Sequence, residues 1–140
     1  MTPRRYQDGD RDSLIALWTR VFPDDPPHNE PAMMLATKLA VDDLVIVVES
    51  DGDLAGACMA GYDGHRGWLY AVAVDSRHRR GGLGTALVEF AVAELVKLGC
   101  PKVNLQIRAG NTAVAEFYES LGFTVEERLS MGKLLVEPSS

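Results

Sequence analysis

Cysteine, histidine and long apolar runs are all scarce in this 140-residue sequence, which has two cysteines and three histidines. No apolar stretch approaches the roughly 20 residues that a bilayer-spanning helix needs. Cys58 and Cys100 do not have a metal-like spacing, so we expect reduced thiols rather than a disulfide framework. No His, Cys or Asp cluster has the spacing of metal ligands, so we expect no metal ion.

Positive charge is also in short supply. The chain has 14 Lys and Arg against 20 Asp and Glu, for a net charge of −6. A nucleic-acid partner would require a basic stripe that displaces counterions, so we predict none. The N-terminal residues lack the apolar stretch of a signal peptide, and we expect a cytoplasmic protein without membrane partners.

The remaining composition is that of one ordinary globular domain. Apolar residues make up 46% of the chain and charged residues 24%. No repeat or Gly/Ser linker divides it, so we predict a single domain over residues 1–140.

The first 41 residues favour helices. After a short strand near Arg4–Gln7, apolar residues at helical spacing predict a helix that starts at Asp10 or Asp12 and ends near Val21. The stretch from Phe22 to Pro31 carries four prolines, Pro31 included, which predicts a loop. A second helix is expected from Pro31 to about Val41.

The next segments predict a meander of three antiparallel strands. The strand-like runs are Leu44–Glu49, Leu54–Gly61 and Trp68–Val74. Asp51-Gly52 and Asp63-Gly64 are hairpin signals between them.

Helices and strands alternate in the rest of the chain. A largely buried helix is expected over Gly82–Leu98, capped by Gly99, and a second over Asn111–Leu121, ended by Gly122. Strands are predicted at Val103–Ile107, Phe123–Val125 and Met131–Val136. Hairpins followed by alternating elements indicate a mixed α/β sheet.

The strongest functional signal is Arg79-Arg80-Gly81-Gly82-Leu83-Gly84-Thr85, between a strand and the long helix. Glycines let a ligand approach the backbone, and the N–H groups at a helix N-terminus favour an anion such as a pyrophosphate. The two arginines add positive charge. A plain glycine turn before a core helix remains the alternative for this motif taken alone.

Two other phosphate-binding motifs do not fit. The sequence lacks the Gly-x-x-x-x-Gly-Lys-Ser/Thr of a P-loop. A dinucleotide-binding motif would follow the first strand of a βαβ unit, whereas Gly82-Leu83-Gly84 follows hairpins.

The glycine segment resembles the acetyl-CoA signature of the GNAT acetyltransferases, Arg/Gln-x-x-Gly-x-Gly/Ala, and Val72-Ala73-Val74-Asp75 precedes it as in that family. The stretch from Asn111 through Phe117-Tyr118 to Leu121-Gly122-Phe123 is similar to the second signature of the same superfamily. The segments Gly61–Gly67 and Leu129–Lys133 resemble a small bacterial branch near the ribosomal-protein N-terminal acetyltransferases.

The resemblance implies a GNAT fold with about seven, largely antiparallel strands and about four helices. It also implies acetyl-CoA as co-substrate. The backbone of Val72, Ala73 and Val74 would hold the thioester and pantetheine arm. The pyrophosphate would bind the loop formed by Arg79, Arg80, Gly81, Gly82, Leu83, Gly84 and Thr85.

The second signature implies roles for two further residues. Asn111 would contact the pantetheine, and Tyr118 would act as the general acid that protonates the departing thiolate. Each residue also has a structural alternative, because Asn111 stands at a helix N-cap position and Tyr118 shares an apolar helical stripe.

The general base is not evident. In the ribosomal-protein branch an acid stands five residues before the Asn, and here that position is Gln106, which cannot accept a proton at neutral pH. A relayed water, Asp63, His65, Glu30 or Glu49 are the alternatives. With Asp24, Asp25 and His28, Glu30 occupies a loop whose acidic character favours a cationic acceptor such as a polyamine, an aminoglycoside-like amine or a peptide N-terminus.

We therefore predict an N-acetyltransferase that moves the acetyl group of acetyl-CoA to a primary amine, on a small molecule or a peptide, by direct attack. A non-catalytic acyl-CoA-binding regulatory module is the alternative from another class. An enzyme directed at tRNA is disfavoured by the acidic charge. A monomer and a homodimer both remain open.

Overall fold

The predicted mixed sheet forms in the computed structural model, which describes residues 2–24, 26–79 and 81–136. Its strands are β1 (Arg4–Arg5), β2 (Val45–Ser50), β3 (Asp53–Tyr62), β4 (Gly67–Val74) and β5 (Val103–Asn104). They lie in the order β1-β2-β3-β4-β5, and only the β4–β5 pairing is parallel. The residue contacts divide the chain into two units, 1–105 and 106–140, and the whole sheet belongs to the first.

The predicted meander is confirmed, and local turn chemistry explains it. Asp51 and Gly52 both have positive φ, at 54° and 82°, as a two-residue turn between twisted strands requires. At the next hairpin, the Asp63 carboxylate accepts hydrogen bonds from the backbone N–H groups of His65 and Arg66, both at 2.8 Å.

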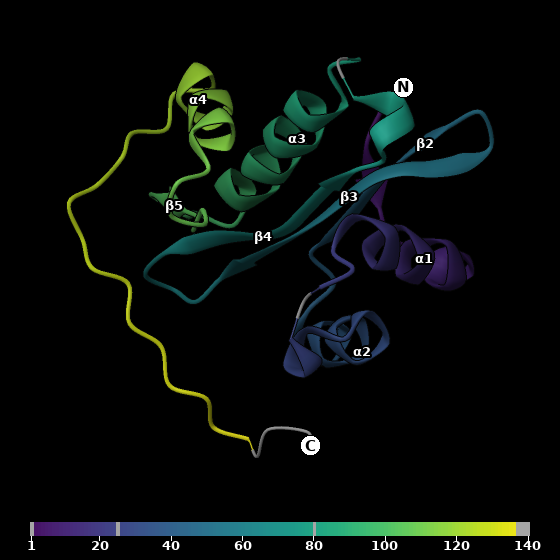
Figure 1. Ribbon diagram of the computed structural model, residues 1–140, viewed down its shortest axis with the longest axis horizontal. Helices are drawn as coiled ribbons and strands as arrows, with labels where there is room; N and C mark the ends of the chain where they lie inside the picture. Colours follow the sequence, from purple (N-terminus) through teal and green to yellow (C-terminus); the bar gives the residue numbers. More distant parts are fainter. Residues whose placement is uncertain (1, 25, 80, 137–140) are drawn as a thin grey trace. The chain divides into compact units, whose positions relative to one another are not determined.

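Helices cover both faces of this sheet. The helices α1 (Arg11–Val21) and α2 (Pro31–Val41) lie on one face and α3 (Leu83–Lys97) on the other (Figure 1). Three short 3₁₀ helices, Asp8–Asp10, Pro27–Asn29 and Ser76–His78, connect the elements. Asp10 is the N-cap residue of α1, but its side chain binds Arg4 and the Gln7 N–H instead of capping the helix.

The two faces bury different apolar sets. Five β2 residues are buried, so this strand contributes to both layers. The layer under α1 and α2 includes Leu14, Leu17, Trp18, Leu35, Val45, Val47, Ala57, Met59 and Ala73. The buried apolar residues of α3 are Leu83, Leu87, Val88, Ala91 and Leu95. The helical spacing of the buried residues in α1 and α3 explains why the sequence pattern identified these two helices.

The α3 layer packs closely at Gly56 of β3. A Cβ atom added there would lie 2.8 Å from Leu87 Cδ1 and 3.1 Å from the Ala73 carbonyl oxygen. We expect Gly56→Ala to lower the free energy of unfolding by about 1–3 kcal/mol, because an extra group in a close-packed layer forces its neighbours apart. Urea denaturation measures this change.

Gly9→Ala is the matched control, because no atom lies within 4 Å of a Cβ built at Gly9. Its free energy of unfolding should stay within about 0.5 kcal/mol of the wild type. Equal stability of the Gly56 and Gly9 variants would show that the α3 layer is looser than this packing indicates.

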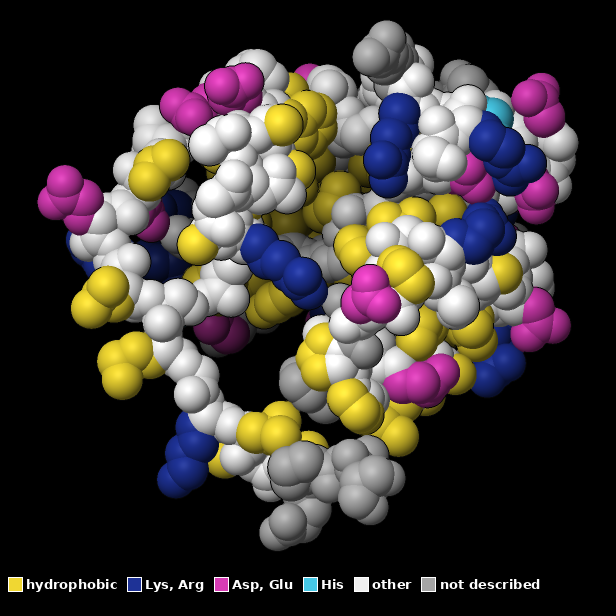
Figure 2. Space-filling model, in the orientation of Figure 1, with side chains coloured by type: hydrophobic (Ala, Val, Ile, Leu, Met, Phe, Trp, Pro, Cys, Tyr) yellow, Lys and Arg dark blue, Asp and Glu magenta, His cyan; other side chains and the backbone are white. Residues whose placement is uncertain are grey.

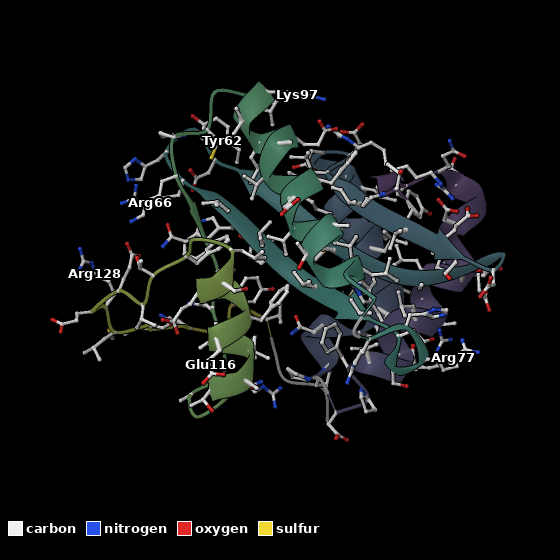
Figure 3. The ribbon with its side chains drawn as sticks, turned by 90° about the horizontal axis from the view of Figure 1, so that it is seen from above. Tyr62, Arg66, Arg77, Lys97, Glu116 and Arg128 are labelled. Atoms are coloured by element: carbon white, nitrogen blue, oxygen red, sulfur yellow. The ribbon has the colours of Figure 1, made fainter. Side chains whose placement is uncertain are left out.

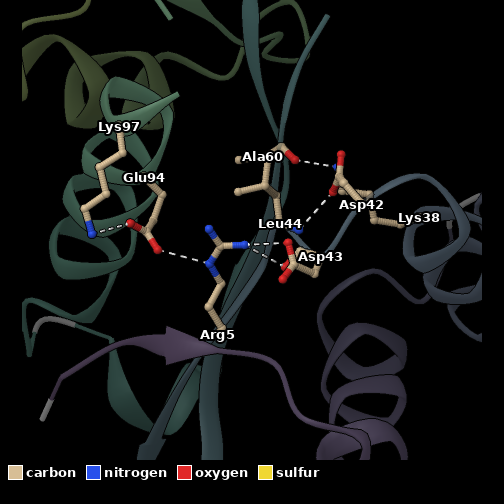
Figure 4. Close-up of polar contacts among 8 residues, drawn as sticks. All are labelled: Arg5, Lys38, Asp42, Asp43, Leu44, Ala60, Glu94 and Lys97. Carbon is tan, nitrogen blue, oxygen red and sulfur yellow. Dashed lines mark hydrogen bonds and ion pairs between the residues drawn. The ribbon is translucent and has the colours of Figure 1, made fainter. Parts of the chain in front are cut away.

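A polar network ties β1 to α3 (Figure 4). Arg5 Nε donates to Glu94 Oε1 at 3.0 Å, and Lys97 Nζ lies 2.8 Å from the other Glu94 oxygen. Arg5 Nη1 also donates to Asp43 Oδ1 at 2.8 Å. Lys97 and Arg5 hold the pKa of the buried Glu94 carboxyl below its ordinary value. The network thereby satisfies a buried carboxylate on a helix whose other buried residues are apolar.

The second unit contains α4 (Thr112–Ser120). Asn111 caps it, as predicted, by accepting a hydrogen bond from the Val114 N–H at 3.3 Å. Gly122 follows the helix with a φ of 94°, which suits glycine at a helix end. The Tyr118 ring makes edge contacts with Phe117 and Phe123, at centroid distances of 4.9 and 5.5 Å.

The mixed α/β class is confirmed, but the strand count is lower than predicted. Among the described residues there are five strands, and β5 ends at Asn104 rather than Ile107. The strands predicted at Phe123–Val125 and Met131–Val136 are wrong, since both stretches are irregular there. A strand requires a neighbouring backbone to pair with, and neither stretch pairs with one among the described residues.

Candidate functional site

One edge of β4 is open beyond its second residue. β5 pairs only with Gly67 and Trp68, so residues 69–74 have no strand on that side in the described part of the chain. On the other side, the Asp75 N–H bonds the Ala55 carbonyl at 2.8 Å. Because hydrogen-bonded pairs alternate in antiparallel ladders, the N–H and C=O of Val74 point away from β3.

One side chain hydrogen-bonds to this edge. The Val74 carbonyl accepts a hydrogen bond from Arg79 Nε at 3.3 Å, so it faces the open side. Val72 lies two residues earlier and shares this direction by the alternation of the strand. The backbone of Val72–Val74 can therefore accept an extended ligand as an additional strand.

Asp75 fixes the turn after β4. Its buried carboxylate accepts hydrogen bonds from the Arg77 backbone N–H at 3.0 Å and from Arg20 Nη2 at 2.9 Å. Arg77 Nη2 also donates to it at 3.1 Å. These Arg77 and Arg20 contacts hold the pKa of the Asp75 carboxyl well below its ordinary value. An Asp75 carboxylate held in its ionised form by these cations thus anchors the chain just before the glycine loop.

The glycine loop leads directly into α3. Gly82 is the N-cap residue, with φ of 79°, and no atom of the described residues lies within 4 Å of a Cβ built there. The first N–H groups of α3, from Leu83, Gly84 and Thr85, lack partners within the helix, as at every helix start. Gly82 has no side chain that could cap them. Such a helix end attracts anions.

The flanking cations are only partly described. Arg79 is exposed, and Arg80 lies outside the described residues. Arg77, on the turn after β4, lies at the opposite end of that strand from Tyr62 and Arg66 in the β3–β4 hairpin (Figure 3). On the face that Figure 2 shows, Lys and Arg side chains lie dispersed among acidic and apolar ones.

The structure brings Val72, Ala73 and Val74 together with the glycine loop in the first unit. Asn111 and Tyr118 belong to the second unit, where Tyr118 is only 7% exposed and Asn111 is exposed. Gln106 lies in the same unit, and its Nε2 donates to the Ser130 hydroxyl. The roles predicted for Asn111 and Tyr118 stay predictions.

The acidic candidates for a general base have structural partners. Glu30 caps α2 and accepts hydrogen bonds from the N–H groups of Met33 and Ala32, which lower the pKa of its carboxyl. The N–H groups of Arg66 and His65 lower the pKa of Asp63 in the same way. Glu49 forms an ion pair with Arg4. Carboxylates with a lowered pKa are weaker bases, which favours a relayed water or the exposed His65.

The two thiols have opposite environments. Cys58 is fully buried, and burial raises the pKa of its thiol to about 12. Cys100 is half-buried and donates to the Lys102 carbonyl at 3.3 Å. We expect a thiol reagent such as dithionitrobenzoate to label one cysteine in the native protein and both in urea, because only the thiolate reacts.

A Cys100→Ser variant provides the control for this labelling. It should give no rapid label in the native state, and fast labelling would place a reactive thiolate at Cys58, contrary to its burial.

In the described part of the chain, no three His, Cys, Asp or Glu side chains gather as metal ligands would. No helix among the described residues is long and apolar enough to cross a membrane.

One feature beside this site was not predicted from the sequence. Ala71, one residue before Val72, has a φ of 49°, although alanine disfavours that conformation. No local signal marks it, since the sequence around it reads as a continuous strand.

Comparisons with known proteins agree with this geometry. The model of the acetyltransferase (GNAT) family matches residues 11–123. An acetyltransferase from Pectobacterium atrosepticum is 37% identical, over 98% of this chain and 97% of its own. The ribosomal-protein-S18-alanine N-acetyltransferase from Escherichia coli superposes with a TM-score of 0.75 at 27% identity, over 88% of this chain and 77% of that one.

A further solved structure shares the fold. The acetyltransferase AAC(6')-Iy, in complex with a CoA-containing bisubstrate analogue, has a TM-score of 0.78 at 16% identity, over 96% of this chain and 97% of that one. An open strand edge that leads into a glycine loop and a helix N-terminus, together with a family match over most of the sequence, establishes the assignment. The chain belongs to the GNAT acetyltransferase family.

Proposed function

We propose that residues 1–140 form a single N-acetyltransferase domain that transfers the acetyl group of acetyl-CoA to a primary amine. The observation that carries the proposal is the open edge of β4, because the chain continues from it through Asp75 to Gly82 and the N-terminus of α3. The family match spans residues of both units, which supports one functional domain.

Acetyl-CoA has two chemical features that suit the open edge of β4 and the N-terminus of α3. Its pantetheine arm carries amide groups, which can pair with the backbone of Val72 and Val74 as a strand would. Its pyrophosphate is an anion that the N–H groups of Leu83, Gly84 and Thr85, which lack partners within the helix, can bind, with Arg79 close by. Gly81 and Gly82 keep side chains away from that anion.

The proposed reaction is a direct displacement. The neutral amine nitrogen attacks the thioester carbonyl carbon, and a C–N bond forms as the C–S bond breaks. The amine loses one proton to a base or a relayed water, and the CoA thiolate gains one from the Tyr118 hydroxyl. Tyr118 is then reprotonated from solvent. No metal takes part in this scheme, and proton transfer by a placed side chain accelerates such steps.

The acceptor is proposed to be a cationic amine, on a small molecule or a peptide. The segment between α1 and α2 carries Asp24 and Glu30, and opposite charge draws a cation toward a site. Asp25 lies outside the described residues. We propose a monomer or homodimer that acts in the cytoplasm without nucleic-acid or membrane partners.

Calorimetry with acetyl-CoA and a thiol-release assay over a panel of amines test the proposal together. The expected result is acetyl-CoA binding, with CoA released in the presence of at least one polyamine, aminoglycoside or peptide. A chain that binds neither acetyl-CoA nor CoA would overturn it.

A non-catalytic acyl-CoA-binding module is the second candidate. Gln106 favours it, because an acid stands at this position in the ribosomal-protein acetyltransferases, near which the branch that the chain resembles is placed. The structural partners of Glu30, Asp63 and Glu49 favour it as well, since they leave no carboxylate of these three unengaged as a base. Binding of acetyl-CoA without thiol release on any amine of the panel is the result that this module predicts.

A further inference from the structure

The open edge of β4 begins at a bulge. Ala57 faces Ala73 and Met59 faces Tyr70, so a single β3 residue, Cys58, lies opposite both Ala71 and Val72. At the bulge Ala71 adopts a φ of 49°. A left-handed conformation is unfavourable for a non-glycine residue, so the surroundings must hold it.

The group that holds Ala71 comes from α1. Trp18 Nε1 donates a hydrogen bond to the Ala71 carbonyl at 3.1 Å. Trp18 is fully buried, and Ala71 packs against the same core cluster. A buried indole N–H needs an acceptor, and a bulge carbonyl outside the ladder needs a donor. Each therefore satisfies the other.

The same helix contacts the other end of the segment. Arg20 donates to Asp75 at 2.9 Å. The helix α1 thus contacts Ala71 within β4 and Asp75 directly after it, and Val72–Val74 lie between these two contacts.

The conformation of Ala71 determines where the Val72–Val74 backbone points. If Ala71 relaxed to an extended conformation, the pairing on one side of the bulge would shift by one residue. Because directions alternate along a strand, such a shift would turn the outward N–H and C=O groups toward β3. Bulges are used in this way beside active sites, to redirect a strand.

We propose that Trp18 is a positioning residue for the acyl-donor site. Its indole N–H holds Ala71 in the left-handed conformation, and this keeps the backbone of Val72 and Val74 directed at the open edge. This inference rests on the proposed function, since it assigns that edge to the arm of acetyl-CoA.

A double-mutant cycle on the CoA dissociation constant tests the role. Trp18→Phe keeps an aromatic ring but removes the donor, and it should weaken CoA binding by about tenfold, in line with the left-handed penalty. Ala71→Gly should restore most of that affinity in the Trp18→Phe background, because glycine adopts a positive φ without help.

Leu14→Val is the control, because Leu14 lies in the same helix and core but forms no hydrogen bond to β4. It should lower stability while CoA affinity is unchanged. A Trp18→Phe protein that binds CoA like the wild type, or one that Ala71→Gly fails to rescue, would overturn the positioning role.

The Ala71 ¹³Cα and ¹³Cβ chemical shifts give a readout that does not depend on a ligand. They should indicate a positive φ in the wild type and an extended backbone in Trp18→Phe. Unchanged shifts would show that other contacts hold the bulge. If the wild type binds no CoA, the proposed function fails and the positioning role with it, while the shifts still show whether Trp18 sets the conformation.

Discussion

Replacing Tyr118 with phenylalanine is expected to lower kcat for acetyl transfer by about 10²- to 10⁴-fold, the usual range for losing a placed general acid. The CoA thiolate would then leave without a proton donor. The KM for acetyl-CoA should change little, because the lost interaction matters only as the C–S bond breaks. Steady-state thiol release with the best amine of the panel measures both constants.

The substitution isolates the hydroxyl because the ring has its own role. The Tyr118 ring packs edge-on against Phe117 and Phe123, and phenylalanine preserves those contacts. Tyr62→Phe, at the end of β3, is the matched control and should keep full turnover. Full turnover in the Tyr118 variant would rule out its role as the general acid.

The second large effect is expected at Gly82. Gly82→Trp should weaken acetyl-CoA binding by about 100-fold or more, because losing two charge-assisted hydrogen bonds, each contributing at least about 1.5 kcal/mol, has that effect. Within the described part of the chain, nothing lies within 4 Å of a Cβ built at Gly82, the N-cap residue of α3, so we expect the indole to occupy the space at the α3 N-terminus. Calorimetry with acetyl-CoA measures the loss.

The opposite end of the same helix supplies the control. Gly99 follows α3 with a φ of 85°, and a Cβ there also meets no atom within 4 Å. Gly99→Trp therefore introduces the same side chain at the same kind of backbone position. It should lower stability to a similar extent and leave acetyl-CoA affinity unchanged. Equal affinity losses in both variants would show that the effect is one of folding.

Local signals in the sequence were sufficient for most of the fold. The spacing of apolar residues predicted α1, α3 and α4, while Pro31 predicted the start of α2. Pro31 and Asn111 stand at the helix starts where they were expected. Asp51-Gly52 formed its predicted turn. These features succeed because a cap, a turn or an amphipathic face depends on residues only a few positions apart.

The pairing of the strands was harder to predict from the sequence. Val103–Ile107 and Met131–Val136 have the composition of strands, yet β5 has two residues and the second stretch is irregular. Ala71 gave no sign of a bulge, and no spacing linked Trp18 to it. Strand pairing and backbone strain depend on partners distant in sequence, which a local pattern cannot record.

The sequence by itself determined the order and type of most elements, the glycine loop after β4 and its family resemblance. Only the tertiary structure decided that β4 has an open edge, that Trp18 holds a left-handed Ala71 at the start of that edge, and that Cys58 is buried while Cys100 is not. The physical reason is the range of the interactions. Helix caps and turns form within one short segment, whereas a free strand edge exists only after every neighbouring strand has taken its place.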